Sequence, residues 1–359
     1  MKKGRFVLLG RSGKERFIQL ICLISSSLLL TSLLFVTSPS AAPAKVFEWK
    51  FQQHLAPSDP SMGCHANLME MIEKNTNGRI KIKIYATDSI TPSSQLFTGV
   101  NTGVVDMAAT DSGWWAGTMP AGAAPSGSMP FAYQETQGIS QILWDYGLEQ
   151  VVRDEYAKHG IYLLADYPIS YSGYGISMNK PVKSLADLKG KKIRGFGLFV
   201  KWLQKLGASA VSLPFAEIYT ALSTGTIDGV CTAWSPTLVL KYYEVAKYGI
   251  LPSANGQGCQ DIVLSMKAWN SLPDDLKMIL QLTAHNWANW VARYYAPNQG
   301  DMIAGLKKAG MTFTTFSEAD QAKMLEAAMS CWDESAGNDP GAKKAVQILK
   351  DYYKKYPPK

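Results

Sequence analysis

The chain contains 359 residues, of which 47% are hydrophobic and 18% are charged. That composition can supply one large or two ordinary hydrophobic cores, and it excludes a disordered or coiled-coil protein. The formal net charge is +7, but residues 1–44 hold six basic residues against one acid, which leaves about +2 for the rest. So small a charge excludes an extended phosphate-binding face, and with it a nucleic-acid partner.

The N-terminus has the order of a secretory signal. A basic segment ends at Arg16 and is followed by an uncharged, leucine-rich segment at 17–36 and by the A-x-A-like site Ala42-Pro43-Ala44. This order predicts a signal peptide over 1–44, cleaved near Ala44 on export to the periplasm. A permanent transmembrane anchor is the alternative, because the apolar segment is nearly long enough to span a bilayer.

Four cysteines lie in the exported part of the chain, and no two of them form a C-x-x-C motif. Zinc-ribbon and thioredoxin-like sites are therefore poorly supported. An oxidising compartment would allow three disulfide pairings, and buried free thiols are an equal alternative. The four residues are Cys64, Cys231, Cys259 and Cys331.

Strands and helices alternate along the exported chain. Ile80, Ile82 and Ile84 alternate with lysines, as in a half-buried strand. Such alternation of strands with helices predicts βα units and mixed or parallel sheets. We expect strands at 46–55, 80–84, 104–108, 161–165, 191–194, 211–213, 227–231 and 262–264. We expect helices at 62–75, 93–102, 134–146, 148–158, 184–189, 198–206 and 215–223, and almost continuous helix from 273 onward.

One segment occurs twice in the sequence. Residues 96–110 align without gaps on residues 218–232, and Thr, Thr, Gly, Asp and Thr coincide at five of the fifteen positions. In both copies the pattern predicts a helix, a glycine that ends it and a strand that follows at once. The repeat indicates two similar α/β lobes. Ligands of such sheets lie beyond the carboxyl ends of the strands, so we expect a cleft between the lobes.

Motifs for catalysis and for nucleotide binding are missing from the sequence. It contains no G-x-S-x-G, H-E-x-x-H, P-loop or G-x-G-x-x-G pattern, and its four histidines lack metal-ligand spacing. The alternative to a binding protein is an exported α/β hydrolase or lyase that acts on a carboxylic acid. No residue spacing supports an active site of that kind.

Arg194 differs from the other three arginines of the exported chain. It closes the strand expected at 191–194 and precedes Gly195-Phe196-Gly197, where glycines allow a ligand or a backbone to approach closely. A guanidinium at the carboxyl end of a strand fits a carboxylate with two parallel hydrogen bonds. From the residues alone, Arg194 is either such a ligand clamp or one partner of a structural ion pair.

An ordered series of segments resembles the DctP family, the solute-binding subunits of TRAP transporters. The loop before Phe131 and residues 156–158 are most similar to members that bind 2-oxo acids or lactate. The segments that carry the resemblance are 181–194 (PVKSLADLKGKKIR), 206–208 (LGA), 214–222 (PFAEIYTAL), 225–229 (GTIDG), 243–248 (YEVAKY) and 269–273 (WNSLP), with 103–107 and 129–131 upstream.

The resemblance implies a receptor without catalysis or cofactor. Its architecture would be α/β, with two hinged lobes, mixed sheets flanked by helices and a ligand cleft between the lobes. The partners would be a small organic acid anion and the small and large permease subunits, and the receptor itself would be a monomer or homodimer. We expect lobe I at 45–167 plus 255–298, and lobe II, with the C-terminal helices, at 168–254 plus 299–359.

The resemblance also implies roles for individual residues. Arg194 matches the arginine that clamps the ligand carboxylate. Tyr174 falls where members that bind sugar acids place a second arginine, so one carboxylate is expected on the ligand rather than two. The other positions implied to contact the ligand or line the cleft are Phe215, Thr232 to Trp234, and Gln53.

Cys231 and Thr232 depart from the family pattern. Members that bind a cation with a 2-oxo acid carry Glu-Trp at these two places. A hard cation requires oxygen ligands, so we expect no bound metal. An apolar, aromatic pocket would suit a small 2-oxo or 2-hydroxy acid or an aromatic one such as indolepyruvate, although core packing is the alternative for each tryptophan. The aromatic residues in question are Trp114, Trp115, Phe196, Phe215 and Trp234.

Overall fold

The computed structural model describes residues 45–54, 61–125, 129–133, 136–169, 173–214, 217–255, 258–295 and 298–356. The predicted signal peptide at 1–44 and its cleavage site near Ala44 lie outside the described residues, and so does Phe215. Within the described ranges, no helix combines the length and the apolar character that a bilayer span requires.

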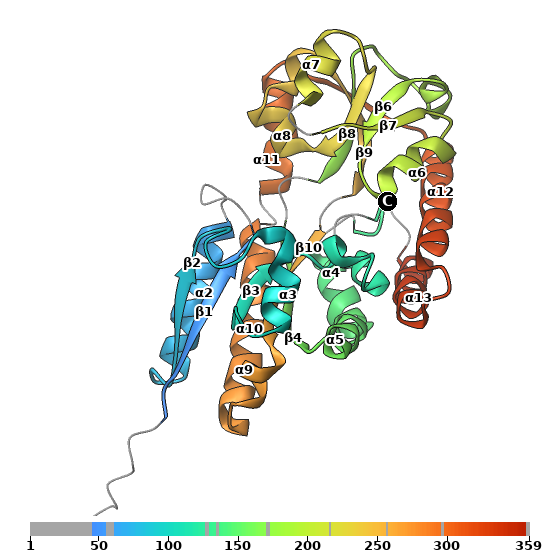
Figure 1. Cartoon of the computed structure of the whole chain (residues 1–359). Helices are drawn as coiled ribbons and strands as arrows, with labels where there is room; N and C mark the ends of the chain where they lie inside the picture. The colour runs from blue at the N-terminus through green and yellow to red at the C-terminus, as the bar shows by residue number, and fades with distance from the viewer. Residues whose placement is uncertain are drawn as a thin grey trace, which may run out of the picture. The chain divides into compact units, whose positions relative to one another are not determined.

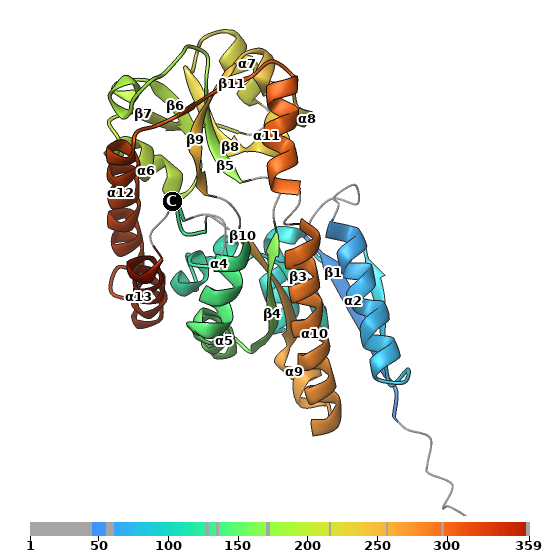
Figure 2. The same cartoon turned by 180° about the vertical axis from the view of Figure 1, so that it is seen from behind.

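The first sheet has five strands, in the order β2 (Ile80–Tyr85), β1 (Phe47–Gln53), β3 (Met107–Thr110), β10 (Gly258–Ser265) and β4 (Ile161–Ile169). β1 runs parallel to β2 and β3, whereas β10 runs antiparallel to β3 and β4 (Figure 1). Two helices lie against one another and against this sheet, α2 (Ser61–Asn75) and α10 (Asp274–Tyr295) (Figure 2). Phe51, Leu68 and Trp287 are buried in the core between them.

The second sheet has six strands, in the order β11 (Thr312–Thr315), β9 (Tyr248–Asn255), β5 (Tyr174–Met178), β8 (Gly229–Ala233), β6 (Lys192–Gly195) and β7 (Ser209–Ser212). β6 runs parallel to β7 and β8, and β5 runs antiparallel to β8 and β9. The helices that pack on or near this sheet are α6 (Leu198–Lys205), α7 (Ile218–Ser223), α8 (Trp234–Val239) and α11 (Asn298–Lys308).

Two long helices close the described chain, α12 (Glu318–Ala336) and α13 (Pro340–Lys355). α12 packs on α6, and α13 packs on α5 (Leu148–Lys158). The indole Nε1 of Trp332 donates a 2.9 Å hydrogen bond to the carbonyl of Pro130. The chain passes between the sheets three times, from β4 to β5, from β9 to β10 and from β10 to β11. The limits proposed above for the two lobes stay a prediction.

The two copies of the sequence repeat have the same local structure. α3 (Leu96–Asn101) precedes β3 as α7 precedes β8. Gly103 and Gly225 follow the two helices with φ of +74° and +71°. Glycine suits that left-handed conformation because it has no Cβ, and it ends both helices as expected.

An aspartate in each copy then joins the repeat to the neighbouring strand. Asp106 accepts a 2.9 Å hydrogen bond from the backbone N–H of Lys50, and Asp228 accepts one of 2.8 Å from Lys192. β3 and β8 each begin at the residue after this aspartate. Both strands therefore start later than expected, because the residues between glycine and aspartate form bends.

The mixed α/β fold with two sheets flanked by helices is confirmed, but three strands were missed. β5, β9 and β11 all belong to the second sheet. β9 contains Gly249 and Pro252, which weaken a strand signal, yet it pairs with β5 on one side and β11 on the other. β11 interrupts the segment after residue 273 that was expected to be almost all helix.

Two helix predictions were also inaccurate. The segment at 134–146 forms α4 (Thr136–Ser140) followed by a π-helical turn at Gln141–Asp145. The segment at 184–189 forms only the 3-10 turn Leu185–Leu188, although it has the expected cap. There Ser184 and Asp187 form a reciprocal capping box, which satisfies backbone donors but does not lengthen the turn.

Candidate ligand-binding site

Arg194 lies in β6, one residue before the strand ends, opposite Val211 of β7 and Val230 of β8. The residue is only 7% exposed. Its Nε donates a 3.2 Å hydrogen bond to the carbonyl of Leu213, which follows β7. The guanidinium carbon lies 5.6 Å from the ring centre of Phe196, a cation–π distance.

Within the described ranges, the charge of this guanidinium is balanced by no ion pair. Burial lowers the pKa of Arg194, and the groups that oppose this effect are Cys231, Tyr242 and Tyr174. Burial raises the pKa of the Cys231 thiol to about 12, and burial together with Asp111 raises the pKa of Tyr174 to about 12. Both groups are neutral at physiological pH. No carboxylate in the described part of the chain forms an ion pair with Arg194.

Gln52 occupies the position in the first sheet that Arg194 occupies in the second. Gln52 lies opposite Ala108 of β3, one residue beyond the start of that strand, as Arg194 lies opposite Val230 of β8. The amide Nε2 of Gln52 donates to the carbonyl of Thr91 at 2.7 Å, and Thr91 aligns with Leu213 when the repeat is extended upstream.

Gln52 and Arg194 differ in which of their polar atoms remain without a hydrogen bond to the described residues. The Oε1 of Gln52 accepts hydrogen bonds from the backbone N–H groups of Ile90 and Thr91, at 2.9 and 3.0 Å, so both its oxygen and its nitrogen are engaged in fixing this segment. Arg194 makes the corresponding contact with Nε alone. Its two terminal nitrogens donate to no described residue. Arginine at this position thus retains the structural contact and adds a two-pronged donor.

Two aromatic rings lie beside Arg194. Tyr174, the first residue of β5, is half-buried, and its ring centre lies 5.3 Å from that of Phe196. Both rings rest on Phe199 of α6, at 5.6 and 5.0 Å. Thr232 of β8 is buried opposite Gly175, the residue after Tyr174. The surroundings of the guanidinium are therefore mostly aromatic and uncharged.

Gln53, the last residue of β1, is completely buried. Neither its Nε2 nor its Oε1 has a hydrogen-bond partner in the described ranges. Leaving a buried amide unpaired costs free energy, so native proteins rarely retain one without a reason. The Gln53 amide is a donor and an acceptor at a strand end where a ligand is expected.

The two tryptophans after β3 differ in exposure. Trp114 is 52% exposed, and its ring lies edge-on to His54, 4.9 Å away. Trp115 is half-buried; its Nε1 donates to Thr110 Oγ1 at 3.2 Å, and its ring lies 5.4 Å from Phe97. Trp115 is therefore held by the protein, whereas Trp114 presents a free face next to the end of β1.

Trp234 is completely buried. Its Nε1 donates to Ser253 Oγ at 2.9 Å, and its ring packs 5.4 Å from Phe313. Gly175 leaves the space for this indole, because a Cβ there would lie 1.8 Å from the ring. The neighbours of Trp234 in the structure are thus protein side chains.

The structure groups the predicted site residues by sheet. Arg194, Tyr174 and Phe196 gather on the second sheet, while Gln53 and Trp114 lie at the ends of β1 and β3 in the first. Tyr242 and the carbonyl of Leu213 also lie beside Arg194 and were not predicted from the sequence. No signal could have found them, because one lies in a short 3-10 turn and the other acts through its backbone.

The cysteines and acidic residues within the described ranges are potential metal ligands. Cys64, Cys231, Cys259 and Cys331 are all buried, and none of the four forms a disulfide. In the described residues, no three side chains among His, Cys, Asp and Glu are grouped so as to hold a metal ion.

A two-sheet α/β fold with a buried guanidinium at a strand end is compatible with a receptor that binds anions. The chain belongs to the DctP family, the bacterial extracellular solute-binding proteins of family 7, whose profile matches residues 51–339. It is therefore an extracytoplasmic solute receptor of the TRAP transporter type, not an enzyme.

Curated relatives and solved structures agree with this assignment. A monocarboxylate 2-oxoacid-binding periplasmic protein of Nostoc is 26% identical over 289 residues, 79% of this chain and 78% of that protein. The 2,3-diketo-L-gulonate-binding periplasmic protein of Escherichia coli is 26% identical over 287 residues, 78% of this chain and 84% of the relative. A TRAP solute-binding protein of Ochrobactrum anthropi has the same fold, with a TM-score of 0.76 at 23% identity, over 87% of this chain and 98% of the other.

Proposed function

We propose that the receptor binds an organic monocarboxylate, a 2-oxo or 2-hydroxy acid, and that Arg194 holds its carboxylate. The observation that carries the proposal is a buried guanidinium whose terminal nitrogens have no acceptor among the described residues. Desolvating a cation without a counter-ion is costly, and a bound carboxylate would supply that counter-ion through two parallel hydrogen bonds.

The uncharged surroundings favour a ligand with one carboxylate. Tyr174 and Cys231, both neutral, stand next to Arg194, and no second cation is found there in the described residues. Phe196, Tyr174 and the exposed face of Trp114 suit an apolar side chain, including an aromatic one such as that of indolepyruvate. The Nostoc relative is named for monocarboxylate 2-oxoacids, although a solved relative from Xanthobacter autotrophicus was crystallised with galacturonate.

Gln53 would supply a second polar contact to the proposed ligand. A 2-oxo or 2-hydroxy group placed near its amide would take up the donor and acceptor that are unpaired in this structure. With Arg194 on one sheet and Gln53 on the other, hinge closure would enclose the ligand for delivery to the permease. Export with cleavage near Ala44 would place the receptor in the periplasm, where it would meet that permease.

A thermal-shift screen tests the ligand class. The purified mature chain is expected to be stabilised by 2-oxo and 2-hydroxy monocarboxylates, aromatic members included, since a ligand that binds only the folded state raises the melting temperature. Dicarboxylates and uronates are expected to give smaller shifts, because the described residues near Arg194 include no second cation for another carboxylate and are mostly aromatic rather than polar. A larger shift with either of these classes would overturn the proposed ligand class.

Replacing Gln53 by alanine is expected to weaken monocarboxylate binding about tenfold, as one hydrogen bond to an uncharged group contributes about 0.5–1.5 kcal/mol. The same change removes an unpaired buried amide, so it should not destabilise the unliganded protein. Calorimetry and melting curves on the same variant measure the two effects. Unchanged affinity would exclude Gln53 from the site.

Removing metal ions is expected to leave ligand affinity unchanged. Cys231, with its thiol pKa raised to about 12, stands where cation-binding relatives are expected to carry an acidic ligand. A protonated thiol is a poor ligand for a hard cation. Calorimetric titration before and after chelation checks this point. A large loss of affinity that added calcium restores would contradict it.

A further inference from the structure

Two aspartates face one another inside the first sheet, away from Arg194. Asp166 of β4 lies directly opposite Asp261 of β10 in the antiparallel register. Both residues are completely buried. Side chains at directly opposite positions lie on the same face of a sheet, with Cβ atoms about 5 Å apart. The two carboxyl groups are therefore close neighbours in the dry interior.

The two carboxyl groups have unequal hydrogen bonding. Asp261 accepts a 2.6 Å hydrogen bond from the hydroxyl of Tyr156 and a longer one, 3.5 Å, from Ser112 Oγ. Neither carboxyl oxygen of Asp166 accepts a hydrogen bond from an ordinary donor in the described part of the chain, which leaves the Asp261 carboxyl as its polar neighbour. A buried carboxylate with donors can carry charge, whereas one without donors is far more stable when it is protonated.

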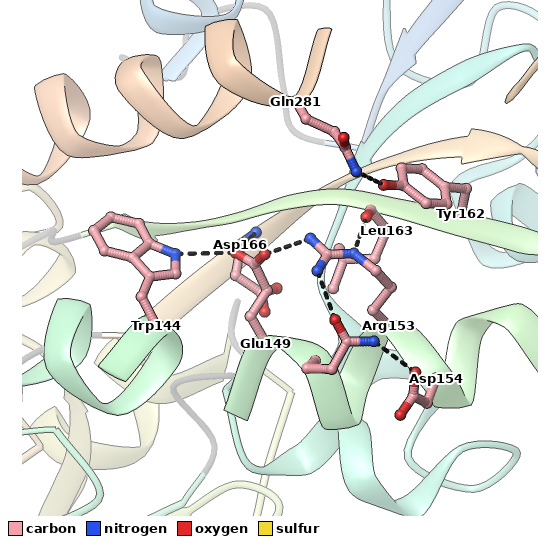
Figure 3. Close-up of polar contacts among 9 residues, drawn as sticks. Trp144, Glu149, Arg153, Asp154, Tyr162, Leu163, Asp166 and Gln281 are labelled. Atoms are coloured by element: carbon pink, nitrogen blue, oxygen red, sulfur yellow. Dashed lines mark hydrogen bonds and ion pairs between the residues drawn. The ribbon is translucent and has the colours of Figure 1, made fainter. Parts of the chain in front are cut away.

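Among the described residues, the positive charge that acts on the pair is that of Arg153 of α5, and it offsets burial and the neighbouring carboxylates only in part. Arg153 forms an ion pair with Glu149 and donates from Nε to the carbonyl of Leu163 at 2.9 Å. Figure 3 shows the Arg153 guanidinium directed at Glu149, which also accepts from the backbone N–H of Asp166 and from Trp144 Nε1. Arg153 is thus already neutralised by a third carboxylate.

The other titratable groups that act on the pair among the described residues carry no positive charge. Burial and the neighbouring Asp261 raise the pKa of Asp111, which follows β3, to about 7. Burial raises the pKa of Tyr133, Tyr156 and Cys259 well above their ordinary values, so all three stay neutral.

We propose that Asp166 and Asp261 form a protonation site that holds a single proton in the folded receptor at neutral pH. The proton resides on Asp166, whose O–H donates a hydrogen bond to the Asp261 carboxylate, and the donors Tyr156 and Ser112 help Asp261 to keep its charge. Two carboxylates in contact cannot both ionise in a medium of low dielectric constant. Burial and the neighbouring Asp261 accordingly raise the pKa of Asp166 well above its ordinary value.

This protonation site makes stability depend on pH in a defined direction. The folded state keeps a proton that the unfolded chain releases above about pH 4. The contribution of this site to the stability of the folded state is therefore greatest below about pH 4. It falls as the pH rises toward the pKa that Asp166 has in the folded state. For one proton the folding equilibrium constant changes by about tenfold per pH unit in that window.

Asp166→Asn tests the proposal, because an amide reproduces the shape and the donor of the protonated acid. Urea unfolding of the mature receptor is measured between pH 5 and pH 9 for the wild type, for this variant and for Asp154→Asn, an exposed acid of α5. Relative to Asp166→Asn, the wild type is expected to lose about tenfold in its folding equilibrium constant per pH unit. The stability of Asp154→Asn is expected to change with pH as that of the wild type does. The proposal is overturned if the stabilities of the wild type and of Asp166→Asn change with pH in the same way.

Infrared spectroscopy supplies a readout that does not depend on how well the variant folds. At pH 7.5 the native wild type is expected to show the carbonyl band of a buried protonated carboxylic acid, and the band is expected to persist in Asp111→Asn. Absence of the band in the wild type, or its loss in Asp111→Asn, overturns the assignment to the pair. Stability that depends on sodium or potassium instead of pH would put a metal cation in place of the proton and overturn it as well.

Discussion

Replacing Arg194 by glutamine is expected to weaken monocarboxylate binding by two orders of magnitude or more while the receptor stays folded. The variant loses two charge-assisted hydrogen bonds to the carboxylate, each contributing about 1.5–3 kcal/mol, and a hundredfold loss needs only about 2.7 kcal/mol. Glutamine is the informative substitute because Gln52 already makes the corresponding backbone contact in the first sheet.

Two further variants complete this test in calorimetric titrations. Arg194→Lys keeps the charge but lacks the planar fork, so its affinity is expected to lie between those of the wild type and Arg194→Gln. Arg293→Ala removes an exposed arginine of α10 and is expected to bind like the wild type. If Arg194→Gln binds a monocarboxylate with nearly native affinity, Arg194 does not hold the ligand carboxylate.

Replacing Gly175 by valine is expected to cause the largest loss of stability among single substitutions near the site. Even the first atom of any side chain there would lie 1.8 Å from the indole of Trp234, which is completely buried and held by Ser253. Overpacking of this kind costs about 3 kcal/mol or more when the neighbour cannot move. The melting temperature is expected to fall by about 6 °C or more.

A matched glycine in α2 provides the control. Gly63 has open space where a Cβ would be added, so Gly63→Ala is expected to leave stability unchanged or slightly raised. Combining Gly175→Val with Trp234→Leu is expected to recover part of the lost stability, because the smaller side chain vacates the space. A melting temperature of Gly175→Val equal to that of the wild type would show that Trp234 can move.

The repeat and the end of β6 were predictable from the sequence because their signals are local. A glycine after a helix and an aspartate before a strand act within a few residues, and both copies of the repeat have these features at the same places. The position of Arg194 at a strand end followed from the same local pattern. Its surroundings did not, because Leu213, Cys231 and Tyr242 reach it from other elements.

The features that depend on tertiary contacts could not be predicted. β9 contains a proline and a glycine, and only its two neighbouring strands make it a strand. For Trp234 the sequence left cleft lining and core packing both open, and its observed contacts are with Gly175, Ser253 and Phe313. The pairing of Asp166 with Asp261 depends on the register of β4 and β10, which no spacing in the sequence reveals.

A crystal structure of the mature receptor with a stabilising 2-oxo monocarboxylate tests the central claim most directly. The account predicts both carboxylate oxygens within about 3 Å of the two terminal nitrogens of Arg194, with the Nε contact to Leu213 retained. A ligand bound elsewhere, with the guanidinium turned toward solvent, would contradict it.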